Sequence, residues 1–287
     1  MIELQYSYIP YLSNETFDSL LEHIDAADFH KSGSNSKCAI IDKYAILKTT
    51  NIPGHDDSFI QIIKTLHQLK NEDINVVPIL GYGIEQTGTP FHNGKRYDKG
   101  YIIQEKAPGK ELLSPSELRD KTDDEKHDLI VDYLKVLKAI PQEHFDKWIT
   151  DFKAITDEKV MIDPSKASNF FYDKKKGFSF IDLNFFMPEN LFDRVDDNGQ
   201  QHHAEFILYS LTPFRSLLGE SGPYYKYLTP EELTIANKIA IDCFNKNMSA
   251  LKKVGVTDAD IYYCASKYNI PLPKQLLAQL RDSISTM

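Results

Sequence analysis

The sequence has little cysteine and no long apolar run, and each shortage excludes a class of protein. The chain has 287 residues, and its three cysteines, Cys38, Cys243 and Cys264, are scattered. They have neither the C-x-x-C spacing of zinc or redox sites nor the even number of a disulfide framework, so we expect reduced, structural thiols. No apolar run approaches the roughly eighteen residues of a membrane span. The start, MIELQYSYIPYL, lacks the basic and apolar regions of a signal peptide. We therefore expect a cytoplasmic protein without a membrane partner.

An excess of basic residues is also missing. The chain has 33 Lys and Arg against 42 Asp and Glu, a formal net charge of −9. This balance argues against a general nucleic-acid-binding protein and is compatible with a cationic small substrate, although solubility explains such an excess equally well. The apolar content of 41% is that of a packed globular protein. The length suffices for one large domain or for two lobes.

Residues 29–48 contain one glycine in a small polar loop. The pattern predicts strand, loop, strand, turn and strand, with Gly33, Ser34, Asn35 and Ser36 in the first loop. Backbone N–H groups in a loop of small residues can cover phosphates, and a plain hairpin turn is the alternative. Lys48 closes the apolar run 44–47, where its ammonium group could reach the α and β phosphates of a nucleotide.

Residues 49–71 contain no glutamate that could pair with Lys48. The sequence Ser58-Phe59-Ile60-Gln61 resembles a capping box and predicts a helix over 59–69. Asp57 or Gln61 could face Lys48 in place of a glutamate, or Gln61 could merely cap its own helix.

A strand is predicted over 76–84, a loop over 85–99, and a second strand in the run 100–109. Adenine binding needs an exposed backbone carbonyl and N–H beside an apolar surface. The run 100–109 resembles the hinge of aminoglycoside phosphotransferases, and this resemblance implies that the backbone of Glu105 and Ala107, with Ile103 nearby, provides both. The alternative is an edge strand that ends at Pro108.

Residues 161–184 contain the acidic and amide side chains that we expect to form the centre of the functional site. Runs 169–172 and 178–181 predict two strands of a hairpin around the polar turn 173–177. In phosphoryl transfer a loop aspartate accepts the proton of the attacking hydroxyl, and an asparagine and a second aspartate hold magnesium ions. Asp163, Asn169 and Asp182 supply these residue types in that order, with an ordinary turn as the alternative for Asp163.

This segment resembles the catalytic segment of the kinase-like phosphotransferases, most closely the aminoglycoside and choline phosphotransferases. Their segment reads H-G-D-x-x-x-x-N, two short strands and an I-D pair. Here Asn169 precedes Asp182 by the usual thirteen residues, and Ile181 precedes Asp182. Two features depart from the pattern: Asp163 stands six residues before Asn169 where the family has five, and no histidine precedes it.

The resemblance implies a two-lobed α+β fold. An N-terminal antiparallel sheet lobe, residues 1–107, would bind the nucleotide, and a mainly helical lobe, residues 108–287, would hold the catalytic and substrate groups. The cofactors would be ATP and Mg²⁺. Lys48 would contact the α and β phosphates, Asn169 and Asp182 would bind magnesium, and Asp163 would act as the base.

The expected second lobe is helical and has no room for the activation segment of protein kinases between Asp182 and Met187-Pro188-Glu189. A small-molecule hydroxyl is therefore the expected acceptor. An atypical protein kinase and a nucleotide-binding pseudokinase that acts as a scaffold are the alternatives. Capping boxes at Ser114 and Thr122, and Pro141, mark helix starts. Further helices are expected over 204–218, 229–253, 258–268 and 273–285.

Overall fold

The structure is a computed structural model that describes residues 11, 29–32, 36–40, 45–53, 58–90, 96–158, 167–180, 204–219, 222–272 and 274–285. These residues form a mixed α+β protein. They divide into two units, one up to Ala107 and the other from Pro108 onward. The sequence also predicted a boundary between two lobes at Ala107 and Pro108. The roles assigned to the lobes stay predictions. The helix expected near residues 13–26 lies outside the described residues.

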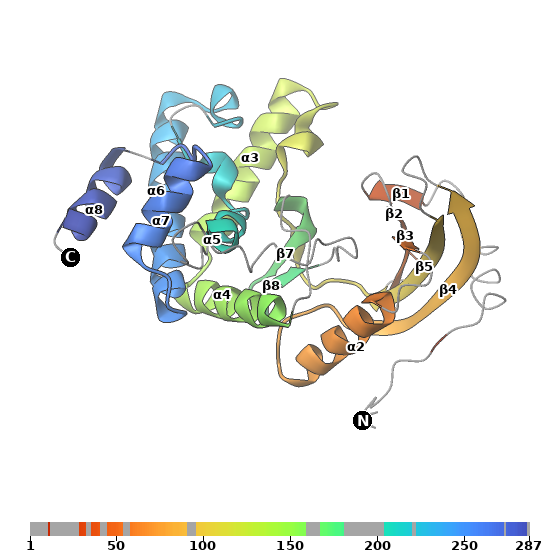
Figure 1. Ribbon diagram of the computed structural model, residues 1–287. Helices are drawn as coiled ribbons and strands as arrows, with labels where there is room; N and C mark the ends of the chain where they lie inside the picture. Colours follow the sequence, from red (N-terminus) through yellow and green to blue (C-terminus); the bar gives the residue numbers. More distant parts are fainter. Residues whose placement is uncertain are drawn as a thin grey trace. The chain divides into compact units, whose positions relative to one another are not determined.

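The first unit contains a five-stranded antiparallel sheet with the strand order β1-β2-β3-β5-β4 (Figure 1). One helix, α2 (Ser58–Asn71), lies between β3 and β4 in the sequence and packs against β4. It buries Phe59, Ile63, Leu66 and Leu69 at helical spacing, as the sequence predicts. The strands are β1 (Phe29–Ser32), β2 (Ser36–Ile40), β3 (Ala45–Pro53), β4 (Ile79–Pro90) and β5 (Arg96–Glu105).

The loop expected over 85–99 is wrong for most of its length. β4 continues to Pro90, and β5 already begins at Arg96, with a register shift between Glu85 and Thr89. Side-chain contacts between β4 and β5 support this longer pairing. The Tyr101 hydroxyl donates to Glu85 Oε2 at 2.5 Å, and Lys99 Nζ lies 4.0 Å from the same carboxylate. Such pairs stabilise strands whose glycine and polar residues alone favour a loop.

The second unit combines a small sheet with helices. The sheet has the order β6-β7-β8, from β6 (Lys110–Glu111), β7 (Phe170–Asp173) and β8 (Gly177–Phe180). Helix α4 packs against β8 and α6, and α3 also packs against α6 (Figure 1). The α-helices are α3 (Asp123–Lys138), α4 (Gln142–Asp157), α5 (Ala204–Ser210), α6 (Pro230–Lys253), α7 (Asp258–Lys267) and α8 (Lys274–Ser285).

An aromatic cluster joins α4 to the small sheet. The Trp148 ring stacks on Phe152, with centroids 4.8 Å apart, and meets Phe170 edge-on at 5.1 Å. Phe145 contacts Phe178 in the same way at 5.7 Å. All five side chains are buried, so Trp148 is a core residue, as its place on an apolar helix face predicts.

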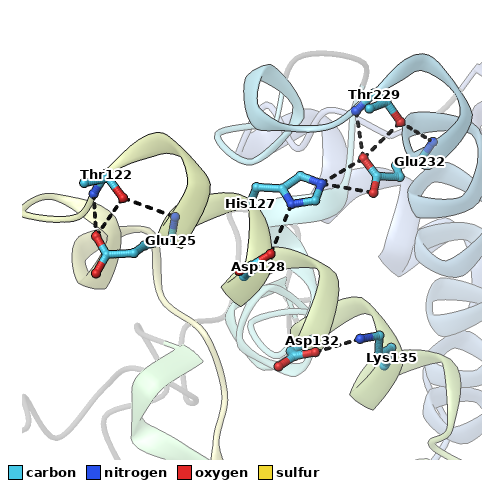
Figure 2. Close-up of polar contacts among 8 residues, drawn as sticks. All are labelled: Thr122, Glu125, His127, Asp128, Asp132, Lys135, Thr229 and Glu232. Carbon is cyan, nitrogen blue, oxygen red and sulfur yellow. Dashed lines mark hydrogen bonds and ion pairs between the residues drawn. The ribbon is translucent and has the colours of Figure 1, made fainter.

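Capping boxes begin α3 and α6 where the sequence predicts them (Figure 2). Thr122 accepts from the Glu125 N–H, and Glu125 Oε2 accepts from the Thr122 N–H. Thr229 and Glu232 repeat this arrangement. The Ser114 box begins only the short 3₁₀ helix Pro115–Leu118. The helix expected over 204–218 is divided, because α5 ends at Ser210 and a 3₁₀ turn follows at Arg215–Leu217.

No helix among these residues is long and apolar enough to cross a membrane.

Candidate functional site

Lys48 lies in the middle of β3 and does not close that strand as the sequence led us to expect. β3 continues to Pro53, which pairs with Tyr97. The β-branched residues Thr49 and Thr50 favour this extension. In the sheet register Lys48 stands opposite Cys38 on β2 and Ile102 on β5. The lysine thus occupies an interior strand, with hydrogen-bonded neighbours on both sides.

The expected phosphate loop is shorter than predicted. Ser36 is the first residue of β2 and pairs with Ser32 and Thr50. The expectation that Ser36 belongs to the loop is wrong, because its backbone is committed to the sheet. Gly33, Ser34 and Asn35 connect β1 to β2 and lie outside the described residues.

The expected adenine-binding segment follows β5. Ile103 is half-buried and pairs with Leu47, while Glu105 is exposed at the end of the strand. The Glu105 N–H donates to the Pro78 carbonyl oxygen at 2.9 Å. Ala107 is buried. The Glu105 N–H is therefore already used within the sheet, which leaves its carbonyl and the Ala107 backbone as the groups to consider for a purine.

Asn169 is the last residue of a 3₁₀ turn, Ala167–Asn169, and directly precedes β7. The predicted hairpin is present: Phe170 pairs with Phe180, and Asp173 pairs with Gly177. In the turn, Asp173 Oδ1 accepts hydrogen bonds from the backbone N–H groups of Lys175 and Lys176, at 2.8 and 3.0 Å. These bonds hold the pKa of Asp173 below its ordinary value.

The strand after Asn169 is held on both sides. β8 pairs with one edge, and β6 pairs with the other through Lys110 opposite Tyr172 and Glu111 opposite Phe171. The Leu112 N–H also donates to the Phe170 carbonyl oxygen at 2.9 Å. This backbone network fixes the chain where it leaves Asn169. Asp163 and Asp182, the two expected carboxylates, lie outside the described residues.

Glu111 is a titratable group that sequence patterns did not single out. It lies opposite Phe171 on β7, so these two side chains belong to the same face of the small sheet. Partial loss of hydration, followed by the charge and hydrogen bond of Glu117, raises the pKa of Glu111 to about 7, although its side chain is still exposed to solvent. No sequence motif marks Glu111, because its pairing with Phe171 and its contact with Glu117 appear only in the folded chain.

Gln104 is the second residue that the sequence did not single out. It stands next to Glu105 on β5, is 2% exposed, and its Nε2 atom has no hydrogen-bond partner among the described residues. A buried amide in a strand reads as ordinary core from the sequence alone. Only the strand register and the burial of the side chain show that this amide is enclosed without a hydrogen-bond partner among the described residues.

The structure places Lys48, Ile103, Glu105 and Ala107 in the first unit, and Asn169 in the second. Within the described ranges no cluster of three or more His, Cys, Asp or Glu side chains could hold a metal ion. The expected magnesium ligands, Asn169 and Asp182, are not such a cluster and stay a prediction. No protein-family model matches the chain, and no curated protein matches it in sequence.

Proposed function

We propose that the chain is a two-lobed, kinase-like phosphotransferase that uses ATP and Mg²⁺ to phosphorylate a hydroxyl of a small molecule. The observation that carries the proposal is the hairpin β7-β8, because Asn169 directly precedes it and Asp182 follows it by two residues. Kinases hold their magnesium ions with one asparagine and one aspartate and place the phosphate-binding lysine on their third strand. Lys48 lies on β3.

The proposed reaction needs few groups. The acceptor hydroxyl attacks the γ-phosphorus as its proton passes to Asp163, and the bond from the γ-phosphorus to the bridging oxygen breaks to release ADP. Lys48 neutralises the α and β phosphates. When bound, magnesium at Asn169 and Asp182 would neutralise the charge that develops on the phosphoryl oxygens. The acidic balance of the chain is compatible with a cationic acceptor.

Variants of the hairpin test the proposal. We expect Asn169→Ala and Asp182→Ala each to lower ADP release by about a hundredfold or more in a coupled assay with Mg-ATP and a panel of hydroxyl compounds. Asp173→Asn is the matched control, because Asp173 lies in the same hairpin but holds only the turn. It should retain turnover. Full turnover in Asp182→Ala, with an unchanged melting temperature, would contradict the magnesium assignment.

One observation favours a second function, a nucleotide-binding scaffold without turnover. Helix α2 reads SFIQIIKTLHQLKN and contains no carboxylate, and Gln61 is exposed. Kinase activity generally requires a glutamate on this helix to pair with the strand lysine. A rise in melting temperature with Mg-ATP, without ADP release or phosphate transfer to the chain itself or to added protein, would support the scaffold. Phosphate on added serine or threonine residues would instead support a protein kinase.

A further inference from the structure

The unpaired amide of Gln104 bears on which purine the proposed site accepts. Its side chain is 2% exposed, and its Nε2 atom finds no hydrogen-bond acceptor within the described part of the chain. A buried donor without a partner destabilises a folded protein, so native structures rarely keep one without a reason. A bound ligand that supplies an acceptor would satisfy it.

The register of the sheet relates Gln104 to Lys48. Gln104 stands opposite Ile46, and Lys48 stands opposite Ile102. Because side chains alternate along a strand, these four positions belong to one face of the sheet. The pair of Gln104 and Ile46 and the pair of Lys48 and Ile102 are two residues apart along the strands, a distance of about 7 Å. If phosphates lie at Lys48, the nucleotide covers the face to which Gln104 belongs.

Gln104 is also adjacent to the segment expected to receive the base. The next residue, Glu105, has used its N–H on the Pro78 carbonyl oxygen at 2.9 Å. The Glu105 N–H is therefore not available to a base at this strand end, where Gln104 Nε2 is a donor beside the Glu105 carbonyl oxygen and the Ala107 backbone. An acceptor on the base would complement that donor.

The two purines differ at the position concerned. Guanine carries an acceptor, O6, where adenine carries a donor, the N6 amino group. We propose, on the basis of the phosphotransferase function above but with a different nucleotide from the ATP named there, that the preferred nucleotide is a 6-oxopurine triphosphate, GTP, and that Gln104 Nε2 donates to O6. With adenine, two amino groups would face each other and both would stay unpaired.

Binding of three nucleotides to the full chain tests this inference. Calorimetry with Mg²⁺ should give GTP and ITP dissociation constants about tenfold below that of ATP, the difference that one well-placed hydrogen bond makes. ITP carries O6 but lacks the N2 amino group of guanine, so equal binding of GTP and ITP assigns the preference to O6. Tighter binding of ATP would overturn the proposal and would mean that Oε1 faces the base.

Two substitutions separate base selection from folding. Gln104→Glu replaces the donor by an acceptor and should reverse the preference toward ATP. Gln104→Leu removes both hydrogen-bonding atoms and should make the three dissociation constants equal, while the melting temperature without nucleotide does not fall. A preference that survives in Gln104→Leu would overturn the role of Gln104. Failure of all three nucleotides to bind the native chain would instead refute the proposed function, and this inference with it.

Discussion

Gly109, just before β6, has a backbone conformation that only glycine adopts without strain. Its φ is +87°, and a Cβ atom at this position would overlap the Tyr172 carbonyl oxygen. The close approach lets β6 reach the edge of β7. A side chain here would push β6 away from the strand that follows Asn169.

We expect Gly109→Ala to lower the free energy of unfolding by about 3–5 kcal/mol, because backbone strain and overlap with the neighbouring strand add. Gly255→Ala is the matched control: its φ is +94°, but no atom lies within 4 Å of the added Cβ. Backbone strain alone should cost that variant about 1–2 kcal/mol. Urea denaturation measures both. Equal losses in the two variants would show that β6 moves aside freely.

At the residue scale, the sequence predicted what local chemistry dictates. The turn 173–177 was visible because Asp173 and Gly177 are turn formers at the ends of apolar runs. The special position of Gln104 was not visible, because an unpaired amide arises from neighbours on two other strands. Ser36 was misassigned for the same reason: serine suits a loop, but pairing with Ser32 and Thr50 holds it in a strand.

Helices α3 and α6 are joined by a histidine and a carboxylate (Figure 2). His127 Nε2 lies 3.0 Å from Glu232 Oε1, and His127 Nδ1 lies 3.4 Å from Asp128 Oδ1. The Glu232 hydrogen bond, followed by that of Asp128, raises the pKa of His127 above its ordinary value of 6.5. Protonation of His127 therefore strengthens the link between these helices.

Because the pKa of His127 is higher in the folded chain, its contribution to stability is complete below about pH 6.5 and is lost as pH rises through the folded-state value. We expect His127→Gln to lower the melting temperature at pH 6 and to have little effect at pH 9. Calorimetric scans at the two pH values measure this.

Glu232→Gln provides the control for this prediction. Glutamine at this position can still complete the capping box with Thr229, but it carries no charge for the imidazolium. In that background, the difference between the effects of His127→Gln at pH 6 and pH 9 should shrink to the part that Asp128 contributes. An equal loss at pH 6 and pH 9 in the native background would show that His127 contributes packing only.

At the element scale, helix starts were predictable and the ends of strands were not. Thr122 and Thr229 cap helices through contacts within four residues, which a sequence displays directly. The length of β4 depends on pairing with a strand that comes after a turn, so residues 86–90 looked like loop. The extension of β3 past Lys48 has the same cause.

The second unit offers internal probes of its own unfolding. Cys243 on α6 and Cys264 on α7 are buried free thiols, and burial raises the pKa of each to about 12. At pH 8 the thiolate fraction of each is therefore far lower than in an exposed cysteine. Trp148, the single tryptophan, lies in the same unit.

We expect a Cys38→Ser variant to resist thiol reagents at pH 8 until urea unfolds the second unit. Both remaining thiols should then react over the urea range in which Trp148 emission shifts, because α4, α6 and α7 belong to one unit. Mass spectrometry of the labelled chain measures each site. If Cys264 reacted at urea concentrations that leave the Trp148 emission unchanged, α7 would open independently of the aromatic cluster.

At the scale of the whole molecule, composition and pattern sufficed for the mixed α+β class, and the described elements bear that out. The expected kinase-like arrangement and its chemistry would require Lys48, Asn169, Asp163 and Asp182 to come together. Spacing alone could name these residues, but their convergence is a property of three-dimensional structure. It stays a prediction.

The two-residue strand β6 gives the second unit an edge that comes from its first few residues. Lys110 and Glu111 hydrogen-bond with β7, far later in the sequence. A fragment that starts at Ser114, the next visible helix signal, would lack this partner and would expose the backbone of the strand that carries Asn169 into the hairpin. The natural starting point for producing the second unit alone is therefore Pro108 or earlier.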